Sequence, residues 1–242
     1  MGNLIKVQDM CKIYNPGENE VRALDHVSLE IDQGEFVAII GHSGSGKSTL
    51  MNMLGCLDVP TSGSYYLNGK DVSSLKDNQL SEIRNQEIGF IFQGFNLIAN
   101  LNAVENVELP LIYRGIGRSE RNKMAKEALK KVGLEKRMHH KPSEMSGGQQ
   151  QRVAIARAIA AEPPVILADE PTGNLDSAST QEIMDILKGL HRGGRSVILI
   201  THDSEIAEQA KRVVRILDGK IVEDYYNKEK RKEKAEETGY EK

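Results

Sequence analysis

The sequence predicts an α/β fold with a mostly parallel sheet, an N-terminal antiparallel β subdomain and an inserted helical subdomain. Three apolar runs of four or five residues, FVAII, VILA and VILI, begin at residues 36, 165 and 197, and runs of this length are typical of buried parallel strands. Short strand patterns with turn residues precede the first run. A long helical stretch lies between the first run and the second. Together these patterns favour one large domain over residues 1–225.

The amino-terminal segment is expected to form the antiparallel layer. Residues 4–7 and 27–31 have strand patterns, and the turn residues Asn15-Pro16-Gly17 lie between them, which suggests antiparallel pairing. A further strand at 64–67 runs into Asn68-Gly69, a dipeptide typical of hairpins. Tyr14, just before the first turn, could stack on a flat ring, although packing alone is the commoner role of such a residue.

A glycine-rich loop follows the apolar run at 36–40 directly. Its sequence from Gly41 to Thr49, GHSGSGKST, matches G-x-x-x-x-G-K-[ST] between a strand and a helix. The glycines let backbone N–H groups turn inward toward an anion at the start of the helix. Lys47 would add a mobile positive charge for the outer phosphates, and Ser48 a hydroxyl for Mg²⁺. The core is therefore predicted to be that of a P-loop nucleoside triphosphatase.

Residues 97–145 have a helical pattern that is too long for one crossover of a parallel sheet. Ser119 is expected to cap the amino end of a helix and Gly133 its carboxyl end. Apolar residues recur between them at helical spacing. We expect a helical subdomain at about 97–160, inserted between the glycine-rich loop and the motif described next.

A second glycine-rich turn opens another helix at Ser146-Gly147-Gly148-Gln149. Its backbone N–H groups and the Ser146 hydroxyl could hold an anion, but no lysine follows as it does in the first loop. The alternative is a serine-capped helix with glycines for a sharp entry. The residues of this stretch leave both interpretations open.

Polar residues follow three of the predicted strands. Asp169 and Glu170 come after the run at 165–168, where Asp169 would hold Mg²⁺ through a water and Glu170 would polarise the attacking water. His202 follows the run at 197–200 and could contact a γ-phosphate. Gln93 ends a strand at 88–92 and could reach Mg²⁺ or a water, although a polar loop residue is the simpler interpretation.

The bulk composition excludes several classes of protein. The 242 residues have a net charge of −3, and the apolar runs are four or five residues long, where a membrane-spanning helix needs about 20; neither a nucleic-acid partner nor a span is expected. The amino terminus has no signal-peptide pattern. Cys11 and Cys56 stand far apart and are expected to be reduced thiols. Residues 226–242 are rich in both charges and are expected to be flexible.

With these motifs in this order, residues 4–224 resemble the ATP-binding cassette (ABC) ATPases. By that resemblance GHSGSGKST is the Walker A loop, Gln93 the Q-loop glutamine, MSGGQ at 145–149 the signature motif, VILADE at 165–170 the Walker B motif, NLD at 174–176 the D-loop, His202 the switch histidine and Tyr14 the adenine-stacking aromatic. The resemblance implies catalytic roles for Lys47, Gln93, Glu170 and His202, and Mg²⁺ ligands at Ser48, Gln93 and Asp169. It implies ATP contacts at Tyr14, Gly41, Ser43, Gly44, Ser45, Gly46, Lys47, Ser48, Thr49, Ser146, Gly147, Gly148, Gln149 and Asp176.

The family also implies the partners. Its ATPases work as head-to-tail pairs, in which the signature helix of one subunit covers the ATP that is held by the phosphate loop of the other. GCLD at 55–58, FIFQGFNLI, ENVELPL at 105–111 and ILADEPTGNLDS look most like the macrolide-export (MacB) and lipoprotein-release (LolD) group. This implies an ATP-hydrolysing subunit at the cytoplasmic face of the membrane, with a separate MacB- or FtsX-like permease and an adaptor protein.

Two alternatives share this chemistry. A division ATPase of the FtsE type would signal through a membrane partner without moving a solute. DNA-repair and translation ATPases carry a long coiled coil or two fused cassettes, which this sequence does not show. The departures from the family pattern are small: Met145 stands where leucine is usual, and Asn174 stands where alanine or serine is common.

Overall fold

A computed structural model describes residues 3–17 and 19–227. The described residues divide into two compact units, one drawn from the ranges 1–75 and 198–242 and the other from 76–197. Among the described residues, no helix has both the length and the apolar character needed to cross a membrane. The part of the predicted tail at 228–242 lies outside the described residues.

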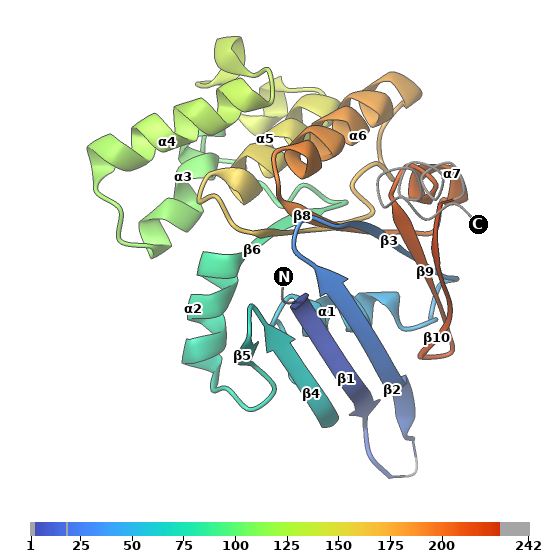
Figure 1. The fold of residues 1–242 in the computed structure, drawn as a ribbon. Coiled ribbons are helices and arrows are strands. Elements are labelled where there is room, and N and C mark those ends of the chain that lie inside the picture. The colour runs from blue at the N-terminus through green and yellow to red at the C-terminus, as the bar shows by residue number, and fades with distance from the viewer. Residues whose placement is uncertain (1–2, 18, 228–242) are drawn as a thin grey trace, which may run out of the picture. The chain divides into compact units, whose positions relative to one another are not determined.

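The first unit contains an antiparallel sheet of strand order β2-β1-β4-β5 (Figure 1). Its strands are β1 (Asn3–Tyr14), β2 (Val21–Asp32), β4 (Ser62–Leu67) and β5 (Lys70–Asp71). The predicted antiparallel start and the Asn68-Gly69 hairpin are confirmed. The expected bounds of β1 and β2 were too short. Both strands continue past several changes of register, including one between Met10 and Lys12. At such a change the alternation of buried and exposed side chains is lost, so the strand pattern in the sequence ends there.

The first unit also contains the strand order β10-β9-β3-β8. These strands are β3 (Phe36–Ile40), β8 (Ser196–Thr201), of which 198–201 belong to this unit, β9 (Arg212–Leu217) and β10 (Lys220–Tyr226). Strand β3 pairs with β9 in parallel, and β9 pairs with β10 in an antiparallel hairpin. All five residues of β3 are buried. The helices of this unit are α1 (Lys47–Leu54) and the short α7 (Ser204–Ala207).

Tyr226 was wrongly placed in the flexible tail. It is the last residue of β10, and its hydroxyl donates a hydrogen bond of 2.9 Å to Glu35. Arg212 lies over its ring at 5.8 Å and forms ion pairs with Glu35 and Asp224 at 3.0 and 2.6 Å. The strand therefore extends because an aromatic residue and an ion-pair network hold its end, although the sequence there is highly charged.

The second unit combines a parallel strand pair with helices (Figure 1). The strands are β6 (Ile88–Phe92) and β7 (Val165–Asp169), and the helices are α2 (Asp77–Glu87), α3 (Ala103–Tyr113), α4 (Arg118–Lys131), α5 (Gly147–Ile159) and α6 (Ser177–Arg192), with two short 3₁₀ turns at Glu135–Arg137 and Pro142–Glu144. The helical character of 97–145 is confirmed, as is the helix opened by Ser146. The buried Glu108 of α3 accepts hydrogen bonds from Arg121 and Asn122 of α4 at 3.1 and 2.7 Å.

Two expected helix caps are one or two residues out of place. Helix α4 has Gly117 at its N-cap, and Ser119 lies inside the first turn. Its C-cap is Val132, and Gly133 follows with φ +73°, as glycine commonly does just after a helix. Serine and glycine are compatible with neighbouring positions at a helix end, so composition alone does not specify which residue takes the cap.

Candidate functional site

The phosphate loop is folded around its own lysine in the first unit. Gly46 caps α1 with φ +105°, and the Nζ atom of Lys47 donates hydrogen bonds to the carbonyl oxygens of Gly41 and His42 at 2.6 and 2.8 Å. The first turn of α1 contains no acidic residue. The positive end of the helix therefore faces the loop without a neutralising side chain in that turn.

Two glycines of this loop stand where a side chain would collide with neighbouring atoms. A Cβ on Gly41 would lie 2.4 Å from the carbonyl oxygen of Ile216, and one on Gly46 would lie 2.5 Å from that of Ala23. The hydroxyl of Ser45 is buried and has no hydrogen-bond partner among the described residues. A tight glycine turn, a mobile cation and an unsatisfied hydroxyl fit a phosphate group, so the residues present are suitable for the triphosphate of a nucleotide.

Tyr14 ends β1 and is held by its neighbours in the first unit. Its hydroxyl donates to Asp58 at 3.2 Å, and the side chain of Thr49 also bonds to it. Burial raises the pKa of the Tyr14 hydroxyl, and the charge of Asp58 raises it further. The Nζ atom of Lys12 lies 5.1 Å from the centre of the ring. A base stacked on Tyr14 would therefore use the ring face opposite Lys12, and the adenine role remains a prediction.

The two carboxylates after β7 differ in their backbone. Asp169 is the last residue of the strand, whereas Glu170 follows it with φ +45°, a left-handed conformation that is uncommon outside glycine. Such strain clusters at functional positions. His202 directly follows β8 in the first unit and is exposed. The next residue, Asp203, caps α7 by accepting hydrogen bonds from the N–H groups of Glu205 and Ile206.

Gln93 follows β6 and is paired with the D-loop in the second unit. Its Nε2 atom donates to Oδ1 of Asn174 at 3.3 Å, and Nδ2 of Asn174 donates back to the carbonyl oxygen of Gln93 at 3.3 Å. A Cβ on Gly173 would lie 2.7 Å from that Nε2 atom. Asn174, which departs from the family pattern, therefore makes a two-way amide contact with the Q-loop.

The start of α5 is a complete capping box. The Oγ atom of Ser146 accepts from the N–H of Gln149 at 3.3 Å, and the Gln149 side chain accepts from the N–H of Ser146 at 3.1 Å. Ser146 therefore caps the helix. The N–H groups at the start of α5 also have the arrangement that an anion-binding site needs, so the geometry is compatible with both roles.

The glycines of α5 allow it to approach α6 closely. A Cβ on Gly148 would lie 2.6 Å from Oγ of Ser179, and one on Gly147 would lie 3.5 Å from Leu175. Asp176 caps α6 by accepting from the N–H and the hydroxyl of Ser179 at 2.9 and 3.0 Å. Hydrogen bonds from Ser179 lower the pKa of the Asp176 carboxyl. The D-loop and the signature motif are thus packed together in one unit.

Three residues that support these motifs were missed in the sequence. Gln151 is fully buried in α5, and its Nε2 atom donates to the carbonyl oxygens of Phe92 and Pro171 at 3.4 and 2.7 Å. Arg157 donates to the carbonyl oxygens of Phe95 and Asn96, in the loop after Gln93, at 2.9 and 2.5 Å. The third is Asp58, described above. Gln151 and Arg157 could have been found because each is a polar residue that shares a helix face with apolar residues of α5.

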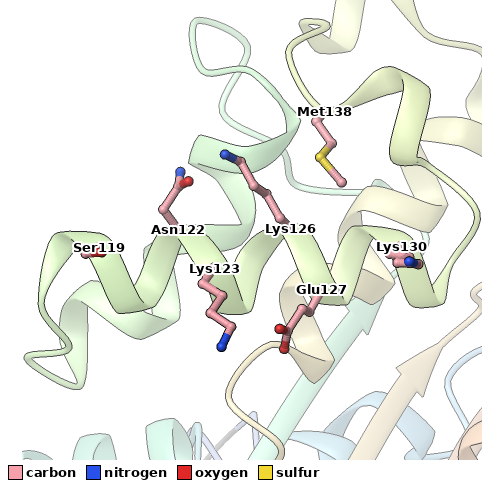
Figure 2. Close-up of a pocket in the computed structure, with 7 residues that line it drawn as sticks. All are labelled: Ser119, Asn122, Lys123, Lys126, Glu127, Lys130 and Met138. Atoms are coloured by element: carbon pink, nitrogen blue, oxygen red, sulfur yellow. The ribbon is translucent and has the colours of Figure 1, made fainter.

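The oxygen donors expected to hold Mg²⁺ belong to both units: Ser48 to the first, and Gln93 and Asp169 to the second. Hydroxyl, amide and carboxylate oxygens are the donor types that Mg²⁺ prefers. Figure 2 shows a different feature, a hollow along α4 that is lined by Ser119, Asn122, Lys123, Lys126, Glu127, Lys130 and Met138. None of the predicted site residues lines it.

Comparison with known proteins identifies relatives that are similar to this chain over most of its length. The macrolide export ATP-binding/permease protein MacB of Hyphomonas neptunium is 54% identical over 237 residues, which are 98% of this chain and 37% of that protein. The ABC transporter ATP-binding protein YknY of Bacillus subtilis is 53% identical over 219 residues, 90% of this chain and 95% of that protein. The chain spans about a third of the length of the MacB relatives that it matches.

A solved structure shares the fold. The ATP-binding cassette MJ0796, described as a dimer in a post-hydrolysis state bound to ADP and Pi, superposes with a TM-score of 0.85 at 47% identity and covers 93% of this chain and 99% of that one. The mixed α/β class with a mostly parallel sheet and an antiparallel β subdomain is thereby confirmed. The family model described as ABC transporter matches residues 24–173. The chain therefore belongs to the ABC transporter family, in its ATP-binding part.

Proposed function

We propose that this chain is the ATP-binding and ATP-hydrolysing subunit of a MacB/LolD-like transporter or mechanotransmission complex. The observation that carries the proposal is the phosphate loop: close glycine contacts, the buried unsatisfied Ser45 hydroxyl and a lysine that now bonds only the loop's own carbonyls. Lys47 can exchange those carbonyls for phosphate oxygens without moving its backbone. The loop is therefore suited to take up a triphosphate.

The chain's own groups would share the work of hydrolysis. When bound, Mg²⁺ would neutralise charge on the phosphates. Lys47 would hold the outer phosphates, Glu170 would orient and polarise the attacking water, and His202 would contact the γ-phosphate. Ser48, Gln93 and Asp169 would hold the ion through oxygen atoms. Gln93 would have to leave its amide contact with Asn174 to do so, and two hydrogen bonds between exposed groups are weak enough to permit this.

The start of α5 at Ser146 explains why two subunits would be needed for one ATP site. It has the capped N–H groups of an anion site but no lysine of its own. A head-to-tail homodimer would place this start over the triphosphate bound to the other copy's phosphate loop, so that ATP joins the two copies and hydrolysis releases them. The relative MJ0796 is described as dimeric, which supports this arrangement.

The membrane partner would be a separate permease, and an adaptor protein would complete the assembly. The MacB relatives are named ATP-binding/permease proteins and are about three times as long as this chain, whereas the ATP-binding protein YknY is close to it in length. A subunit of the YknY kind would be held at the cytoplasmic face of the membrane by that permease.

ATP hydrolysis by the purified full chain tests the phosphate-loop assignment. Lys47→Ala removes the only mobile cation of the loop and is expected to reduce turnover at least about 100-fold, because electrostatic stabilisation of transferring phosphoryl groups contributes about that much per donor. Lys70→Ala, at an exposed hairpin position, is the matched control and should hydrolyse ATP like the unaltered chain. Full nucleotide affinity and full turnover in Lys47→Ala would contradict the assignment.

A further inference from the structure

A cluster of metal-ligating side chains lies in the antiparallel sheet of the first unit. A ligand atom from each of Cys11, Asp25 and His26 lies within 4.8 Å of the others, and the Nε2 atom of His26 is 3.7 Å from Oδ1 of Asp25. Cys11 is on β1, while Asp25 and His26 are on β2. None of the three belongs to the residues assigned to ATP or Mg²⁺.

The strand irregularities bring these side chains together. The pairing of β1 with β2 changes register between Val7 and Met10 and again between Met10 and Lys12. His26 has φ +54°, and its backbone N–H donates to the Sγ atom of Cys11 at 3.3 Å. This contact holds the Sγ atom of Cys11 beside the part of β2 that carries Asp25 and His26.

A carboxylate behind the histidine orients its ring. The Nδ1 atom of His26 is 2.7 Å from Oδ1 of Asp9. This contact fixes the ring so that Nε2 faces Asp25, and a carboxylate on the far ring nitrogen is the outer-shell arrangement found at histidine ligands of metals. The ring is therefore oriented to present Nε2 to a metal ion.

The cations around Asp25 leave one of its oxygens available. Lys220 is 3.0 Å from Oδ2, and its hydrogen bond is the main cause that lowers the pKa of the Asp25 carboxyl. Oδ1 faces His26 at 3.7 Å, with Arg22 at the longer distance of 4.0 Å. A cation could therefore take Oδ1 while Lys220 keeps Oδ2, although the two nearby positive charges would weaken its binding.

We propose that Cys11, Asp25 and His26 form a binding site for Zn²⁺ or a similar divalent transition metal, with water as the fourth ligand. One sulfur, one imidazole nitrogen and one carboxylate oxygen match the ligands of Zn²⁺ and not those of Mg²⁺. Tetrahedral Zn²⁺ ligands at about 2.0–2.3 Å from the ion require only a small contraction of this cluster. The bound ion would link β1 to β2. It would also raise the free energy of unfolding, by an amount that grows with the logarithm of the free metal concentration.

Cobalt and zinc titrations of the full chain, reduced and free of nucleotide, test the site. Co²⁺ should give a thiolate-to-metal charge-transfer band with one equivalent bound per chain, and Zn²⁺ should abolish the band and raise the melting temperature. Cys11→Ser should lose the band, and His26→Gln should weaken Zn²⁺ binding at least tenfold. Asp9→Asn should weaken it by about 10-fold, as loss of an outer-shell partner does.

Three controls separate this site from other metal-binding groups. Cys56→Ser removes the other thiol and should leave the band intact, and the double variant His139→Gln/His140→Gln removes an adjacent imidazole pair in the second unit and should do the same. Lys220→Met removes the competing ammonium and should tighten binding. No thiolate band in the unaltered chain, or equal Zn²⁺ affinity in Cys11→Ser, His26→Gln and the unaltered chain, would overturn the proposal. Neither outcome depends on ATP hydrolysis.

Discussion

Gly46→Ala perturbs the phosphate loop at a glycine that combines a left-handed backbone with a close contact. The residue has φ +105°, and its Cβ would lie 2.5 Å from the carbonyl oxygen of Ala23 and 3.3 Å from the Ile216 side chain. A left-handed conformation costs an L-residue about 1–2 kcal/mol, and forcing atoms into a filled space costs a further about 1–3 kcal/mol. The free energy of unfolding is therefore expected to fall by about 2–5 kcal/mol.

Gly44→Ala is the matched control, because it measures the cost of the left-handed backbone conformation without a close contact. Gly44 also has a positive φ, +77°, but nothing lies within 4 Å of its Cβ, so only the conformational cost of about 1–2 kcal/mol applies. Urea unfolding of both variants without nucleotide measures the difference, with circular dichroism to confirm that each folds. Equal losses of unfolding free energy in the two variants would refute the argument that Gly46 is required by close contact with Ala23.

Two further substitutions test the capping and charge arguments. Ser146→Asp keeps the N-cap of α5, since aspartate caps as well as serine, but places a negative charge where a phosphate would bind; unfolding stability should be retained while ATP turnover is lost, and retained turnover would contradict the anion role. Asp58→Asn tests pH dependence: burial opposes the charge of Asp58, but hydrogen bonds, first from Lys12 and then from the Val59 N–H, lower its pKa overall. A carboxyl whose pKa is lowered by folding stabilises the fold above about pH 4, and this stabilisation is lost as the pH falls through the folded pKa. The unaltered chain should therefore be more stable than Asp58→Asn at pH 7, and the difference in unfolding free energy should disappear in acid. A difference that does not change with pH would argue against the Lys12–Asp58 contact.

Much of the fold was predictable because it depends on local pattern. The five apolar residues of β3 and the Asn68-Gly69 turn are sufficient to indicate a buried strand and a hairpin. Helix α2 was missed because only Leu80 and Ile83 are buried in its eleven residues, which leaves little periodicity to detect. The end of β10 was missed because the contacts of Tyr226 with Glu35 and Arg212 join residues that are far apart in sequence.

The site was predictable as a set of motifs but not as a set of contacts. The spacing of GHSGSGKST identifies a phosphate loop, whereas the left-handed backbone of Glu170 and the amide pair of Gln93 with Asn174 arise from tertiary packing. The cluster of Cys11, Asp25 and His26 depends on register changes between two strands. Such changes have no reliable signal in one sequence, because a single bulge reverses the faces on which later side chains lie.

If the phosphate loop is half of a site that a second copy completes, ATP should hold two copies together when hydrolysis is blocked. Glu170→Gln keeps the shape of the side chain and removes the group proposed to polarise water, so sedimentation velocity of this variant with and without MgATP measures that pairing. We expect a dimer that forms only with MgATP, does not turn over, and is abolished when Ser146→Asp is added. A variant that stays monomeric at full ATP occupancy, or that hydrolyses ATP like the unaltered chain, would contradict it.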